Sequence, residues 1–416
     1  MIHEQQNTRP TMVAETDEPT QAFLDTQALL DERQDRGTLI PGDFADLHRR
    51  VSDIHTALDA SDIDRPLDEA SLRYLDGRAA LRFRRPDGAW DSPLSFTGAA
   101  LSQMGLRVLG SGGLKYLERK RQRGVTGAKL AEICWADDMV HQAKPSLLRT
   151  VQLPDQPYRT IRGVLSGGGR GYQTFDGVDL VDTLASLPEF AGLPVIESRV
   201  TLDHTRIRFL LDPADAALFD SSTGKLRNPT NSHDTGLNLM VPMCEVGVGE
   251  IGNGSTYAYG CGYQYRCLNG LGSWSGDSAK WRWTHAGHNQ ADRVRAGLAD
   301  ALTSIRLTAS GVVADYNRSV EVAVEDAWAL LDSWGVQAGQ LTQRQARRAH
   351  EAQDDESCTR GRNIARIVDG ITLAAQEETD ILQQRSLEQF AHRLMVRGIR
   401  NGHQNGGRVV LETAEA

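Results

Sequence analysis

Residues 243–288, MCEVGVGEIGNGSTYAYGCGYQYRCLNGLGSWSGDSAKWRWTHAGH, decide the fold that we expect for this chain. From residue 257 to residue 267 large side chains alternate with small or polar ones, and successive side chains of a β-strand point to opposite faces. One face of the predicted strand carries Tyr257, Tyr259, Cys261, Tyr263, Tyr265 and Cys267. The other face is nearly bare and carries Ala258, Gly260, Gly262, Gln264 and Arg266. Glycine inside a strand allows another backbone to approach closely, and Asn269-Gly270 predicts a turn.

The aromatic face has two possible uses. Tyrosines commonly pack half-buried against a helix layer. Alternatively, they form a platform on which the bases of a single-stranded nucleic acid stack, while nearby cations meet the phosphates. Lys280-Trp281-Arg282-Trp283 interleaves cations with aromatic rings as such a platform requires, and this spacing also fits an amphipathic edge strand.

A metal site is a third possibility for the same stretch. Its ligand types are Cys244, Cys261, Cys267, His285 and His288. Structural zinc ligands come in close pairs along the sequence, and only His285 and His288 are so spaced here. We therefore expect no metal at these residues, although the sequence alone does not decide whether they bind one. We also expect no other cofactor and assign no catalytic residue.

The composition is that of an ordinary soluble protein. Of the 416 residues, 40% are hydrophobic and 24% are charged, and no apolar run approaches the roughly 18 residues of a membrane span. The N-terminus lacks the basic start and apolar core of a secretory signal. Five cysteines without dense spacing fit a reducing compartment. We expect a protein of the bacterial cytoplasm without a membrane partner.

Charge is unevenly distributed along the chain. The overall net charge is -9, whereas residues 81–170 carry a net charge of +8 between acidic flanks. Local patches rather than total charge decide contact with phosphates. This basic segment therefore either binds a polyanion or forms a solvated cationic face without a partner.

Periodicity predicts an α+β fold. Apolar residues recur at helical spacing before residue 59 and again after residue 291. Strand patterns lie at 147–153 and 158–166, and 200–211 predicts a hairpin turning near Asp203-His204. We expect a central mixed, mainly antiparallel sheet, from about 147 to 290, flanked by N- and C-terminal helices.

The predicted domain organisation has five parts. Residues 1–20 form a disordered tail, and 21–80 form an acidic helical extension with a break near Gly37 and Pro41. Residues 90–310 form the α+β core, whose first half is basic. A C-terminal helical region follows at 311–398, where Gly398 is expected to end the last helix, and 399–416 form a flexible tail.

Several segments in order resemble the family of unknown function numbered 932, the phage/plasmid-like proteins. They are Arg159-Thr-Ile-Arg162 with Ser166 and Gly171-Tyr172, Glu245-Val-Gly247, Tyr263-Gln-Tyr-Arg-Cys-Leu-Asn-Gly270, His285-Ala-Gly287, and Thr359–Met395. The resemblance spans about residues 90–397. Met243-Cys244 stands in place of Asn-Ser, Gln264 in place of arginine, and a triple glycine precedes Tyr172. The resemblance implies a mobile-element origin and supplies no catalytic residues.

Our leading hypothesis is a non-enzymatic phage- or plasmid-type protein that binds single-stranded DNA or RNA in recombination or replication. The residues expected to bind are Arg159, Arg162, Arg170, Tyr172, Tyr263, Tyr265, Arg266, Asn269, Lys280, Arg282 and His285. The alternative is a structural or host-interaction protein that uses the aromatic strand as a homo-oligomer or partner interface.

Overall fold

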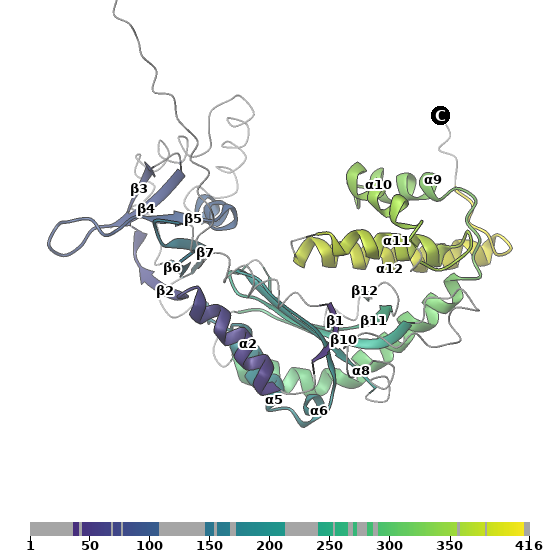
Figure 1. Cartoon of the computed structure of the whole chain (residues 1–416), viewed down its shortest axis with the longest axis horizontal. Coiled ribbons are helices and arrows are strands. Elements are labelled where there is room, and N and C mark those ends of the chain that lie inside the picture. Colours follow the sequence, from purple (N-terminus) through teal and green to yellow (C-terminus); the bar gives the residue numbers. More distant parts are fainter. Residues whose placement is uncertain are drawn as a thin grey trace, which may run out of the picture.

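The computed structural model confirms the α+β fold class (Figure 1). It describes residues 36–40, 44–67, 70–75, 78–107, 146–153, 156–166, 172–212, 240–252, 254–264, 269–272, 281–285, 290–355, 358–378 and 381–411. The strands in these ranges form two sheets, where the sequence predicted one. No helix in these ranges is long and apolar enough to cross a membrane.

Sheet A lies in the middle of the molecule and is antiparallel throughout. Its order is β1 (Arg36–Ile40), β8 (Val195–Val200), β9 (His204–Leu210), β10 (Met240–Gly249), β11 (Thr256–Gln264) and β12 (Asn269–Gly272), and β13 (Arg282–Trp283) also pairs with β11. The predicted hairpin is confirmed, because β8 and β9 pair with Val200 opposite Thr205. Asn269 and Gly270 belong to β12, so the turn predicted there is wrong.

Sheet B forms one end of the molecule in Figure 1. Its order is β2 (Ser61–Arg65), β6 (Ser146–Val151), β7 (Thr160–Ser166), β5 (Leu94–Phe96), β4 (Arg78–Phe83) and β3 (Ala70–Leu75). The pair β5–β7 is parallel and the others are antiparallel. Its apolar core includes Ala100 and Met104 from the helix at 98–107.

Helices cover both faces of sheet A. On one side lie α2 (Phe44–Ala57), α5 (Gly177–Ala185), the short α6 (Pro188–Ala191) and the long α8 (Gln290–Ser319). The C-terminal helices are α9 (Ala327–Leu331), the π-helical turn η5 (Asp332–Val336), α10 (Gln343–Ala352), α11 (Ile364–Gln376) and α12 (Ile381–Gln404). They share a second core, which includes Leu387, Phe390 and Met395 of α12.

Helix α8 packs against the bare face of β11. A Cβ placed on Gly260 would overlap the carbonyl oxygen of Ile305 and lie 2.7 Å from the backbone nitrogen of Ala309. Tyr257, Tyr259, Cys261 and Tyr263 lie together on the opposite side. Both the alternation of faces and the close backbone approach, predicted from the sequence, are therefore confirmed for the described part of this strand.

Three predicted boundaries differ from the structure. Within the predicted helical extension, residues 61–65 form β2, which pairs with β6 far along the chain, and residues 70–75 form β3, which pairs with β4. The helix confirmed there is α2, and residues 1–35 lie outside the described ranges. The boundary at 310/311 falls inside α8. Gly398 lies within α12, where its missing Cβ makes room for Ile364, so it packs the helix instead of ending it.

We expect Gly260→Ala to destabilise the fold by about 1–3 kcal/mol or more, because the added methyl group meets helix backbone that cannot move aside alone. Gly311→Ala is the matched control, since nothing lies within 4 Å of a Cβ there. Alanine in the middle of α8 should stabilise by about 0.5–1 kcal/mol. Urea unfolding of both variants tests this, and equal stability would contradict the close packing of α8.

Candidate functional site

Glu250, at the end of β10, is the centre of a buried polar cluster between the two sheets. Its Oε2 lies 2.8 Å from Arg162 Nη1 and 3.2 Å from His55 Nε2. Its Oε1 accepts hydrogen bonds from the Gly177 backbone N–H at 3.1 Å and the Thr205 hydroxyl at 3.0 Å. These four partners, Arg162, His55, Gly177 and Thr205, come from β7, α2, α5 and β9.

Electrostatics keep this glutamate ionised. Burial alone would raise the pKa of Glu250, but His55 and Arg162 hold that pKa well below its usual range. Burial likewise opposes protonation of His55, and the Glu250 carboxylate nevertheless raises the pKa of the imidazole. The pair is therefore favoured in its charged form.

A second ion pair completes this cluster. Arg149 of β6 pairs through both terminal nitrogens with the Asp176 carboxylate, which also lies at the N-terminus of α5. The same guanidinium reaches Asp62 Oδ1 at 3.1 Å and the Glu250 carbonyl at 2.7 Å. Arg149 therefore links β2, α5 and the end of β10.

Two rings border the cluster. Tyr172 and His285 stack with nearly parallel planes and ring centroids 5.1 Å apart. The Tyr172 hydroxyl donates to the Glu250 carbonyl at 3.3 Å. His285 is 5% exposed, and burial lowers the pKa of its imidazole. Arg162, Tyr172 and His285, three of the residues predicted to bind nucleic acid, thus meet around Glu250.

Sequence reasoning missed His55, Arg149, Asp176 and Glu250 as members of this cluster. His55 lies on the inner side of a plain amphipathic helix, and Arg149 is the one charged residue of a short strand of otherwise apolar and hydroxyl-bearing residues. The available signal was Glu250 itself, a carboxylate that directly follows a strand of buried residues.

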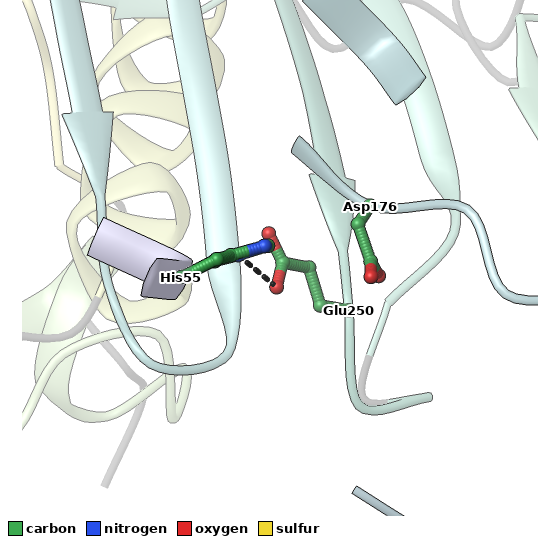
Figure 2. A group of neighbouring side chains, drawn as sticks. All are labelled: His55, Asp176 and Glu250. Carbon is green, nitrogen blue, oxygen red and sulfur yellow. Dashed lines mark ion pairs between the residues drawn. The ribbon is translucent and has the colours of Figure 1, made fainter. Parts of the chain in front are cut away.

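The geometry of three side chains resembles a metal site. Ligand atoms of His55, Asp176 and Glu250 lie within 4.8 Å of one another, and Figure 2 shows the His55 imidazole directed at the Glu250 carboxylate. However, Glu250 already accepts hydrogen bonds from Arg162, Gly177 and Thr205, and its charge is paired with His55 as well as with Arg162. Arg149 engages both oxygens of Asp176. The arrangement therefore fits an ion-pair cluster better than a metal centre.

Cys244 and Cys261, which the sequence left open as metal ligands, do not come together. Cys244 and Cys261 are both buried, but Cys244 packs in the core under α8 and Cys261 packs on the tyrosine side of the sheet. Burial raises the pKa of both thiols, which disfavours the thiolate that a metal requires. Cys267 and His288 lie outside the described residues.

A second polar group lies on the other face of sheet A. Cross-strand neighbours form two rows, in which Glu197, Arg208, Glu245 and Tyr259 lie side by side, and so do Arg199, Arg206, Gly247 and Tyr257. With Tyr263 they make up what we call the Tyr-Arg face. A Cβ on Gly247 would lie 2.5 Å from Cζ of Tyr257, so this glycine leaves room for the ring over β10.

Glu245 is the hub of the Tyr-Arg face. Its Oε1 accepts the hydroxyls of Tyr259 at 2.6 Å and Tyr257 at 3.2 Å, and its Oε2 lies 2.7 Å from Arg208 Nε. Arg208 also pairs with Glu197 at 2.9 Å, and Arg206 pairs with Glu197 as well. Burial would raise the pKa of Glu245, but Arg208 and Arg206 lower it.

The first half of α12 covers this face through polar contacts. Arg385 lies over the rings of Tyr257 and Tyr259, with its Cζ 3.8 Å and 4.8 Å from their centroids. Glu388 Oε2 is 2.6 Å from Arg208 Nη2, and Gln384 accepts a hydrogen bond from Arg199 at 2.6 Å. Tyr263 is fully buried. In this conformation the tyrosines pack under a helix layer and offer no open platform.

The other predicted residues are scattered. Arg159 is partly exposed and bound to Asp59 and Ser61 beside sheet B. Asn269 lies in β12, and Arg282 is exposed on β13. Arg170, Tyr265, Arg266 and Lys280 lie outside the described residues.

Glu250→Gln should lower the free energy of unfolding by about 3 kcal/mol or more, because it removes the charge that compensates Arg162 in a buried site. The exposed Glu321 provides the control, and Glu321→Gln should change stability by less than about 0.5 kcal/mol. Urea titrations at pH 7 measure both. A similar stability for the two variants would contradict the central role of Glu250.

His204 should make the fold acid-sensitive. Its Nε2 lies 3.2 Å from the Tyr257 hydroxyl, and burial, with Arg385 nearby, lowers its pKa to about 3. Below pH 6.5 the unfolded chain binds this proton and the folded chain does not, so stability falls as pH falls, by up to about 1.4 kcal/mol per pH unit.

The measurement is the pH dependence of urea unfolding between pH 6 and pH 4, for the wild type and for His204→Gln. The variant should lose stability less steeply, since the contribution of His55 is common to both proteins. Parallel curves would exclude a buried neutral His204.

Comparisons of this chain with protein-family models, with curated proteins and with solved structures found no match. The resemblance to the phage/plasmid-like family therefore stays a prediction. The function has to be argued from the two polar clusters themselves.

Proposed function

We propose that this protein binds single-stranded nucleic acid on the Tyr-Arg face of sheet A, in a conformation in which the first half of α12 has left that face. We assign no catalytic role to it. A part in the recombination or replication of a phage or plasmid follows only from the family resemblance and belongs to the same proposal.

The observation that carries the proposal is the cross-strand arrangement of this face. Arg206 and Arg208 lie on β9, and Tyr257 and Tyr259 lie on β11 beyond β10. Phosphates are met by cations and bases by aromatic rings in proteins that bind single strands. A row of arginines beside a row of tyrosines supplies both, and the flexible strand of a nucleic acid can follow it.

The charge balance of the face supports a polyanion as its ligand. Without the covering helix, its described buried arginines still outnumber its described buried glutamates: Arg199, Arg206 and Arg208 against Glu197 and Glu245. Burying so many charges costs free energy that apolar residues of similar volume would avoid. A contact between a sheet and a helix does not require this composition, whereas a phosphate-binding face does.

The alternative, a partner or oligomer interface on the same strand, uses the same aromatic residues. The surplus of arginine on this face favours a polyanion over an ordinary protein surface, and we therefore rank the nucleic acid first.

The test is fluorescence anisotropy of a labelled single-stranded oligonucleotide, titrated with the full chain at low and at physiological salt. Binding should weaken steeply as salt rises, because counterion release favours binding at low salt. Tyr259→Leu should weaken binding by about 1–3 kcal/mol, the value of one stacked base. Tyr259→Phe keeps the ring and should bind like the wild type.

Thermal unfolding of each variant shows whether the fold is intact. If the wild type does not bind at low salt, or if Tyr259→Leu and Tyr259→Phe bind equally well, the Tyr-Arg face is not the binding surface. A stable larger assembly that is indifferent to nucleic acid would favour the partner interface.

A further inference from the structure

We infer that α12 regulates binding by competing with the nucleic acid for the Tyr-Arg face. In this inference Arg385 occupies the position where a base would stack, and Glu388 occupies the position where a phosphate would bind. This inference rests on the proposed function and adds its regulation. The covering helix then sets how much of the protein is competent to bind.

The contacts of Arg385 imitate a stacked base. Its planar guanidinium lies over the Tyr257 ring at 3.8 Å and reaches Tyr259 at 4.8 Å. The two rings are themselves stacked, with centroids 5.8 Å apart. A flat cation over an aromatic ring and a base on the same ring use the same surface, so both cannot be present at once.

The contact of Glu388 imitates a phosphate. Its carboxylate meets Arg208 Nη2 at 2.6 Å. Arginine pairs with carboxylate and phosphate oxygens through the same donors. Burial raises the pKa of Glu388, with Glu245 adding to that effect and Arg208 opposing it.

The orientation of α12 makes release of the face feasible. Its apolar side chains Leu387, Phe390, Leu394 and Met395 belong to a core that the C-terminal helices share with α8 and with Met240 and Leu271 of sheet A. The side chains that touch the Tyr-Arg face, Gln384, Arg385 and Glu388, are polar. Release of the Tyr-Arg face therefore means that these polar contacts are exchanged for equivalent contacts with a ligand, while the shared apolar core keeps α12 attached to the molecule.

Population arithmetic gives the direction of the effect. When the binding-competent state is a minor fraction of the protein, the apparent dissociation constant rises by the inverse of that fraction. Any change that weakens the cover without harming the face should thus tighten apparent binding. Glu388→Gln is such a change, because Arg208 keeps Glu197 and Glu245 as partners.

The experiment compares oligonucleotide binding by the full-length wild type, Glu388→Gln, and Gln384→Ala with Glu388→Gln. We expect apparent dissociation constants about threefold lower for the single variant and about tenfold lower for the double variant. Arg393→Ala is the matched control on the same helix, since Arg393 contacts Gln340 and not the sheet. This control should bind like the wild type.

Hydrogen exchange supplies a second readout on the unmodified protein. Adding the oligonucleotide should speed amide exchange in residues 381–392 and slow it in β11.

Two results overturn the inference and are distinguishable from each other. If the wild type binds, the variants bind no better and exchange in α12 does not change, the cover is wrong and the proposed function stands. If neither the wild type nor the variants bind, the proposed function fails and the cover fails with it.

Discussion

The buried carboxylate of Glu250 is the constraint on which the arrangement of this molecule depends. Its hydrogen-bond and ion-pair partners lie on β7, α2, α5 and β9. One charge therefore connects strands of both sheets and two helices. Arg149 and Asp176 brace the same junction from β6 and α5. Removing one partner of a buried charge costs much free energy, so these residues favour one arrangement of the two sheets and the helices.

Sheet A is built to be approached differently on its two faces. On one face glycine and alanine in β11 let the backbone of α8 come close, and the packing is apolar. On the other face tyrosine hydroxyls, glutamates and arginines form one hydrogen-bonded group under α12. Apolar packing is hard to exchange, whereas polar contacts can be replaced by those of a charged ligand.

The polar cluster around Glu250 and the Tyr-Arg face share neighbouring residues of the chain. Thr205 donates to Glu250, and its neighbour His204 contacts Tyr257 on the Tyr-Arg face. β9 and β10 therefore carry residues of both groups. A ligand that displaced α12 from the Tyr-Arg face would act on strands that also hold the junction between the sheets, which offers a physical route for coupling the two ends of the molecule.

The sequence by itself determined which residues share a face. The alternation of β11, the glycines that seat α8, the β8–β9 hairpin and the helical stripes of α11 and α12 follow from local periodicity. The choice of Arg162, Tyr172 and His285 also came from the sequence, although not their meeting around Glu250. The geometry of the backbone sets which side chains of a strand or helix share a face, and this can be read from a single sequence.

Only the tertiary structure decided what covers each face and which charges pair. Tyr263 lies on the predicted face but is fully buried, because the face is closed by elements distant in sequence. His55 and Glu250 form an ion pair although the sequence around each residue gives no sign of this contact. Strand β2 formed where an acidic helix was expected, because its pairing with the distant β6 outweighed local preference, whereas β3 pairs with β4, the next strand along the chain. Burial and ion pairing depend on contacts between remote segments, and local sequence patterns do not encode those contacts.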